Sequence, residues 1–126
     1  MSLILALHTL YAIVQCMHLT FIQYAAFTKR WRQYRLTDED LQALEQQLME
    51  QPEAGDLMQG AGGLRKARFA PPSLHTGKSG AYRVGYVYFR TAAVIMLLVI
   101  FPKSAQPNLT AAEKALFKKV IASLRP

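Results

Sequence analysis

An unbroken apolar run at residues 92–101 restricts how this chain can fold more than any other feature of its sequence. The run is rich in valine, isoleucine and leucine and contains no polar side chain. A membrane-spanning helix needs about 20 apolar residues, so the run is too short to cross a bilayer. It is typical of a strand that is buried on both faces. We therefore expect a central strand, with a chain of 126 residues forming one domain around it.

Helical patterns mark three other segments. Aromatic residues at positions i, i+4 and i+7 predict the buried face of a first helix (Phe27, Trp31 and Tyr34). A second helix should begin at Thr37, which can cap a first turn rich in acids, and should end before Pro52. Thr110 and Glu113 have the spacing of a capping box, which predicts the start of a third helix.

Strand-like segments occupy residues 19–24, 64–70 and 81–89, with a short edge strand at 56–59. Together with the apolar run they predict the order β-α-α-β-β-β-β-α. The expected fold is α+β, a compact antiparallel β-sheet with two N-terminal helices and one C-terminal helix. We assign residues 17–126 to this single domain. Residues 1–16 are then an apolar N-terminal extension, which could reflect an upstream start, an accessory helix or an interfacial anchor, but no stable membrane span.

Charge is distributed unevenly along the chain, whose net charge is +7. Residues 36–56 contain seven acids and no base, whereas residues 57–112 contain seven bases and no acid. Charges of both signs are usual on a solvated surface. A segment that carries only positive charges therefore predicts contact with an anionic partner such as nucleic acid or the ribosome. The single cysteine, Cys16, excludes an intramolecular disulfide and a thiolate metal cluster, and it fits a reducing cytoplasm. We expect no metal or other cofactor.

The strongest local signal is a glycine-rich turn at residues 60–63 that leads into three cations, Arg65, Lys66 and Arg68. In a strand, Lys66 and Arg68 share one face and Arg65 lies on the other. Two residues of strand span roughly 6.6 Å, a spacing that suits neighbouring phosphates of one nucleic-acid strand. A hairpin with a solvated basic face would give the same local pattern.

A longer composite pattern resembles the RelE/HigB family of bacterial toxins, and most closely its HigB-like branch. It consists of Asp-x-x-x-Gly-x-Gly-Gly-Leu-Arg-Lys-x-Arg at residues 56–68, Gly-Lys-Ser-Gly-x-Tyr-Arg-Val-x-Tyr at residues 77–86, Lys103, and Asn-Leu-Thr at residues 108–110. The likeness covers about residues 18–124. It implies a fold related to microbial ribonucleases and the toxin of a type II toxin-antitoxin system. Such toxins are ribosome-dependent mRNA endoribonucleases (mRNA interferases) that enter the A site and inhibit translation. The implied partners are mRNA on the ribosome and an antitoxin, a small helix-turn-helix protein encoded beside the toxin.

Cleavage of RNA by its own 2′-hydroxyl requires a base, stabilisation of the charged phosphorane, and an acid for the leaving oxygen. Residues 57–112 offer no carboxylate and a single histidine, His75. Neighbouring cations disfavour the charged form of a lysine, so Lys66 is our candidate base, with Arg68 and Arg83 as the phosphate clamp. The expected RNA- or ribosome-binding residues surround these three (Arg65, Lys78, Tyr86 and Lys103), and Tyr82 is an alternative to Tyr86 for stacking on a base.

Three other classes of function fit parts of the sequence. One is a ParE-like toxin that inhibits gyrase on the same scaffold, which would not need a basic face at Lys66, Arg68 and Arg83. Another is a catalytically inactive relative that only binds nucleic acid. The third is a small membrane-associated protein that uses residues 1–16.

Overall fold

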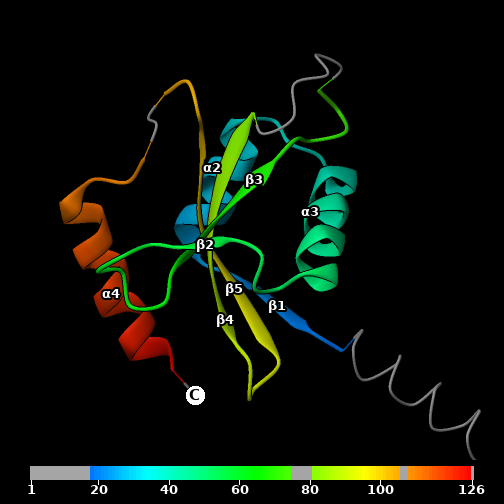
Figure 1. Ribbon diagram of the computed structural model, residues 1–126. Helices are drawn as coiled ribbons and strands as arrows, with labels where there is room; N and C mark the ends of the chain where they lie inside the picture. Colours follow the sequence, from blue (N-terminus) through cyan, green and yellow to red (C-terminus); the bar gives the residue numbers. More distant parts are fainter. Residues whose placement is uncertain (1–17, 75–80, 106–107, 126) are drawn as a thin grey trace, which may run out of the picture.

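The computed structural model describes residues 18–74, 81–105 and 108–125. Its helices and strands follow one another in the predicted order (Figure 1): β1 (Thr20–Gln23), α2 (Ala25–Gln33), α3 (Asp38–Glu50), β2 (Asp56–Leu57), β3 (Arg65–Phe69), β4 (Tyr82–Phe89), β5 (Val94–Pro102) and α4 (Ala111–Leu124). The predicted α+β class is confirmed. The N-terminal extension, His75 and Lys78 lie outside the described residues.

The five strands form one sheet in the order β1-β5-β4-β3-β2. All neighbouring pairs are antiparallel except β1 and β5, which run parallel, so the sheet is mostly antiparallel and β1 alone departs from the predicted direction. The apolar run forms β5, which is paired on both sides and buried on both faces as predicted. A bulge opposite Gly85 and Tyr86 leaves Leu98 of β5 without a partner in β4.

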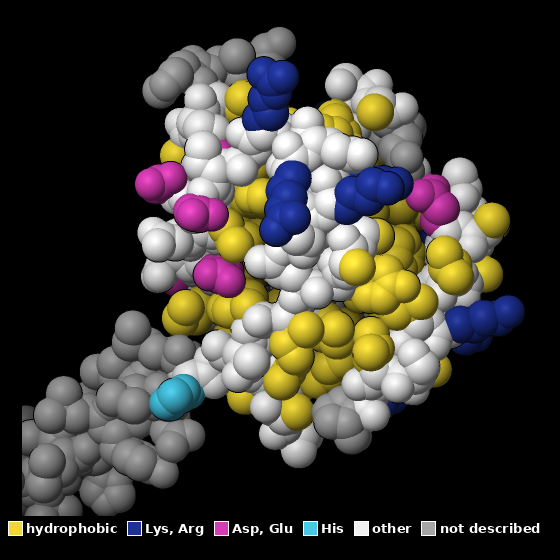
Figure 2. Space-filling model, turned by 180° about the vertical axis from the view of Figure 1, so that it is seen from behind, with side chains coloured by type: hydrophobic (Ala, Val, Ile, Leu, Met, Phe, Trp, Pro, Cys, Tyr) yellow, Lys and Arg dark blue, Asp and Glu magenta, His cyan; other side chains and the backbone are white. Residues whose placement is uncertain are grey.

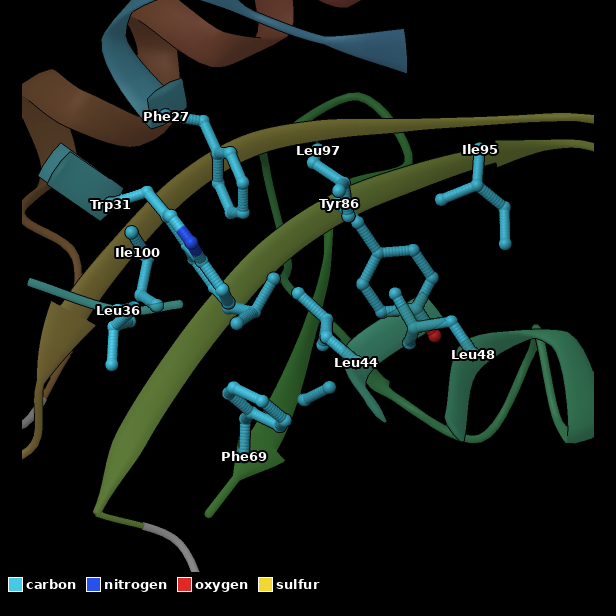
Figure 3. Close-up of a cluster of buried hydrophobic side chains, with 12 residues drawn as sticks. Phe27, Trp31, Leu36, Leu44, Leu48, Phe69, Tyr86, Ile95, Leu97 and Ile100 are labelled. Carbon is cyan, nitrogen blue, oxygen red and sulfur yellow. The ribbon is translucent and has the colours of Figure 1, made fainter. Parts of the chain in front are cut away.

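Helices cover the two faces of the sheet with separate apolar cores. Helices α2 and α3 lie on one side and α4 on the other (Figure 1). Between the sheet and α2 and α3, Trp31 stacks on Phe27 and Phe69, with ring centroids 5.5 and 6.0 Å apart (Figure 3). The core under α4 includes Phe117 and Ile121 of that helix. This two-sided burial explains why β5 is apolar throughout.

Local signals set the chain reversal between the first two helices. Helix α2 ends in a Schellman motif, in which Leu36 N–H donates to Trp31 O and Arg35 N–H donates to Arg32 O, with Arg35 at φ 55°. Helix α3 then begins with a capping box. The hydroxyl of Thr37 accepts from Asp40 N–H, and the carboxylate of Asp40 accepts from Thr37 N–H. The N-cap predicted at Thr37 is therefore confirmed.

The glycine-rich turn before β3 is a packing element for α4. Gly62 has φ +71°, and a β-carbon there would lie 3.1 Å from the Cα of Lys118. Arg125 donates from Nη2 to Gly62 O at 3.3 Å, and the neighbouring Ala61 and Leu64 are fully buried. A side chain at Gly62 would combine an unfavourable backbone angle with a clash against the helix backbone. The turn thus fixes α4 against the same face of the sheet that carries Lys66.

Candidate nucleic-acid interface

The pairing of β3 with β4 brings three cations together on one face of the sheet. Arg68 lies directly opposite Arg83, and Lys66 lies opposite Gly85. In an antiparallel pair the Cα atoms of opposed residues are about 5 Å apart, and diagonal neighbours are about 7–8 Å apart. Side-chain alternation places Lys66, Arg68 and Arg83 on the α4 side of the sheet, since Leu64 and Phe101 of that core share their face. The structure therefore assembles the three predicted catalytic residues.

The three cations differ in exposure. Arg68 is exposed and Lys66 is half-buried, whereas Arg83 is only 7% exposed. The Nη1 atom of Arg83 donates to Tyr82 O at 3.2 Å, which holds the guanidinium near the strand. Arg83 is thus the fixed member of the cluster, and Lys66 and Arg68 are the accessible ones. We name these three residues the basic face.

Lys103 extends the basic face at one end of the sheet. Its N–H donates to Ala81 O at 3.1 Å, so the pairing of β4 and β5 continues one residue beyond β5. Alternation from Phe101 puts the Lys103 side chain on the same face as Arg83, one step further along the strands. The exposed ammonium is therefore placed to contact a chain that crosses the basic face.

Arg65 and Tyr86 lie on the other side of the sheet and hold the connection between α3 and β2. Arg65 Nη1 donates to Glu53 O and to Gly55 O, both at 2.8 Å. The hydroxyl of Tyr86 donates to Pro52 O at 2.7 Å and accepts from Gly55 N–H at 3.2 Å. The ring of Tyr86 is fully buried and points toward α3 (Figure 3), and burial raises the pKa of its hydroxyl. In this arrangement neither face of the Tyr86 ring is accessible for stacking with a nucleobase. We therefore leave Tyr86 and Arg65 out of the proposed RNA site.

Tyr82, the alternative stacking residue, is half-buried beside Tyr34, with ring centroids 5.4 Å apart. Alternation places it on the side of α2 and α3, away from the basic face. Burial, with the neighbouring Tyr34 and Asp40, raises the pKa of the Tyr82 hydroxyl. Its ring is therefore used in packing.

A cavity of about 500 Å³ opens beside the basic face, between α3 and the exposed edge of β3. Lys66 and Arg68 line one wall, and residues of α3 and of the segment that follows it line the other. Asp56 of β2 also lines the cavity and lies directly opposite Lys66 in the sheet. In the sequence Asp56 is the last acid of residues 36–56 and the first residue of both the edge strand and the composite pattern, but its pairing with Lys66 follows from the strand register.

Asp40 anchors the chain that leaves β3. Its carboxylate is fully buried and accepts hydrogen bonds from Ser73 N–H at 3.0 Å and from the Ser73 hydroxyl at 2.6 Å, besides the bond from Thr37. Burial alone would raise the pKa of Asp40, but the hydrogen bonds from Ser73 and Thr37 outweigh it and lower that pKa. Asp40 thus completes the capping box of α3 and also fixes the connection between β3 and β4.

Asp40→Asn should lower the free energy of unfolding by about 1–3 kcal/mol at neutral pH, because an amide offers one acceptor where the carboxylate uses two. The folded-state pKa lies below the unfolded one. The stabilisation is therefore present above the unfolded pKa of about 3.9 and is lost as pH falls through the folded value. Urea unfolding at about pH 7 and pH 3 checks this sign. A gap between the two proteins that stays constant with pH would contradict it.

A second group of cations lies on the opposite side of the molecule. Figure 2 shows the protein from behind, with lysine and arginine side chains above an apolar area and most of the visible acids toward the left edge. Helix α2 contains Lys29, Arg30 and Arg32 and no acid. Arg30 donates to Ile100 O at 3.3 Å, and the other two are exposed. The sheet separates this group from Lys66 and Arg83, so it is not part of the basic face.

The fold and the basic face together define a small α+β protein whose sheet surface suits phosphate binding. Comparison with known families places it more closely: the model described as "RelE toxin of RelE / RelB toxin-antitoxin system" matches residues 21–125. The chain belongs to this family of toxins. A structure of an E. coli RelE mutant in the free state has 19% sequence identity and a TM-score of 0.48, over 71% of this chain and 87% of that one. No helix in the described residues is long and apolar enough to span a membrane.

Proposed function

We propose that this toxin is a ribosome-dependent mRNA endoribonuclease, of the HigB-like branch, that inhibits translation in the cytoplasm. The observation that supports the proposal most directly is the joining of Lys66, Arg68 and Arg83 on one sheet face by the register of β3 and β4. A gyrase-binding toxin on the same scaffold would have no need for this group. The adjoining cavity of about 500 Å³ is large enough for a nucleotide.

The chemistry follows from the exposure of each cation. The guanidinium of Arg83, fixed near its own strand, binds the scissile phosphate, and Arg68 opposite it supplies a second fork of donors. Both stabilise the additional charge that develops on the phosphorane. Lys66 exchanges a proton with the reacting oxygens, and Lys103 holds the RNA backbone further along the face. Lys78 has the same backbone-binding role in this proposal.

Dependence on the ribosome fits a site that is open and basic. Side chains as exposed as Arg68 and Lys103 position a flexible RNA poorly on their own. A large partner that holds the codon in place supplies the orientation, which can contribute about 7–11 kcal/mol to a reaction. We propose a small helix-turn-helix antitoxin as the regulatory partner, which blocks this access.

The test is to induce the protein in bacteria and to map the 5′ ends of mRNA, with translation active and with initiation blocked. We expect new ends inside translated codons only when translation is active. Purified protein added to programmed ribosomes should give the same cuts, and naked mRNA should stay intact. Growth arrest with intact mRNA and inhibited gyrase would overturn the proposal in favour of the ParE-like function.

A further inference from the structure

Asp56 places a carboxylate at the basic face. It lies on β2 in direct register with Lys66 of β3, and Lys66 is in turn opposite Gly85 of β4. Opposed residues of an antiparallel pair project on the same side of a sheet, so Asp56 shares the face of Lys66 and Arg83. Asp56 is exposed, and both it and Lys66 line the same cavity.

Asp56 is the only acid in the five described strands. The other candidates are committed elsewhere or lie on another element. The carboxylate of Asp40 accepts from Thr37 and Ser73, Glu113 caps α4, and Glu50 belongs to α3. No hydrogen bond or ion pair to another described residue occupies the Asp56 carboxylate. It is therefore a free acceptor beside a row of cations.

We propose that Asp56 is the general base of the RNA cleavage reaction and that Lys66 is the general acid. This assignment rests on the proposed function and changes the role that the sequence suggested for Lys66. A carboxylate is suited to accept a proton, whereas an ammonium group can only donate one until it has lost its charge. The pairing puts an acceptor and a donor about 5 Å apart at their backbones, and Arg68 and Arg83 lie two residues further along β3 and β4, where they can hold the phosphate.

One proton is accepted and one is donated in a single step. The Asp56 carboxylate takes the proton of the 2′-hydroxyl while the 2′-oxygen forms its bond to phosphorus. The bond from phosphorus to the 5′-oxygen breaks, and its electron pair leaves with that oxygen, which takes a proton from the Lys66 ammonium group. The products are a 2′,3′-cyclic phosphate and a 5′-hydroxyl, and exchange with water restores both side chains.

The roles can be separated with two mRNAs that differ in one atom at the cleaved linkage, a 5′-oxygen or a 5′-sulfur. A thiolate leaves without protonation because its conjugate acid is far stronger than an alcohol, so the sulfur substrate needs a base but no acid. Single-turnover cleavage is measured on programmed ribosomes with the full chain, Asp56→Asn, Lys66→Ala, and the control Asp38→Asn. The control removes an exposed carboxylate from the first turn of α3.

We expect Asp56→Asn to cleave both substrates about 10²- to 10⁴-fold more slowly than wild type, and Lys66→Ala to recover most of its loss on the sulfur substrate. Asp56→Glu should retain part of the activity. Wild-type rates for Asp56→Asn, or recovery of Asp56→Asn on the sulfur substrate, would overturn the assignment. If the wild-type protein cleaves neither mRNA on ribosomes, the proposed function itself fails, which is a different result from a loss confined to the variants.

Discussion

Cleavage of translated mRNA is expected to fall by about 10²- to 10⁴-fold when Lys66 is replaced by alanine, the usual range for loss of a proton-transfer group. Lys66 is half-buried, lies opposite Gly85 and has Arg68 two residues along its strand. Its removal leaves the leaving oxygen without a donor and takes one positive charge from the phosphate site. Growth after induction and the rate of codon cleavage on purified ribosomes both measure the loss.

Arg90→Ala is the matched control for this prediction. Arg90 is an exposed cation just beyond the end of β4, seven residues from Arg83 along the chain, or about 23 Å if the strand is extended. It changes the net charge by the same amount without touching the basic face. Equal loss of cleavage in both variants would mean that overall charge, and not Lys66, drives the activity. Unchanged cleavage in Lys66→Ala would show that the site lies elsewhere.

Tyr86→Ala is expected to produce the largest loss of stability, about 3–5 kcal/mol in the free energy of unfolding. Tyr86 is the largest of the fully buried side chains and lies in the core between the sheet and α3. The change leaves a cavity and also removes the partner of Pro52 O and of Gly55 N–H. Against a total stability of about 5–15 kcal/mol for a domain, this loss is a large share of the free energy of unfolding. Denaturant unfolding followed by tryptophan fluorescence of Trp31 measures the effect.

Tyr86→Phe separates the packing role of this residue from any contact with RNA. The ring stays in place while the two hydrogen bonds are lost, so we expect a smaller loss of about 1–3 kcal/mol. Because the ring is buried, the folded variant should bind programmed ribosomes with wild-type affinity. Weaker ribosome binding by a fully folded Tyr86→Phe protein would return Tyr86 to the RNA site that the sequence suggested.

The helices and strands of this protein could be predicted from its sequence. Local capping signals at Thr37 and Thr110, helical spacing at Phe27 and Trp31, and the apolar run of β5 depend on neighbours along the chain, which a sequence displays directly. The alternation of β3 also separated Lys66 and Arg68 from Arg65 correctly. The sequence did not reveal the relative direction of the strands, because no local signal indicates that β1 runs parallel to β5.

The residues that meet at the basic face could not be predicted in this way, because strand pairing brings them together. Register is fixed by the packing of both sheet faces against helices, and a shift of one residue would turn every side chain to the other face. That register sets Arg68 against Arg83 and Asp56 against Lys66, and it turns Tyr86 into the core. The sequence supplied the charges, but the distance between Asp56 and Lys66 in space, unlike their separation along the chain, follows from strand pairing. For that reason the proximity of Asp56 to Lys66, on which its proposed role as base depends, is seen only in the folded protein.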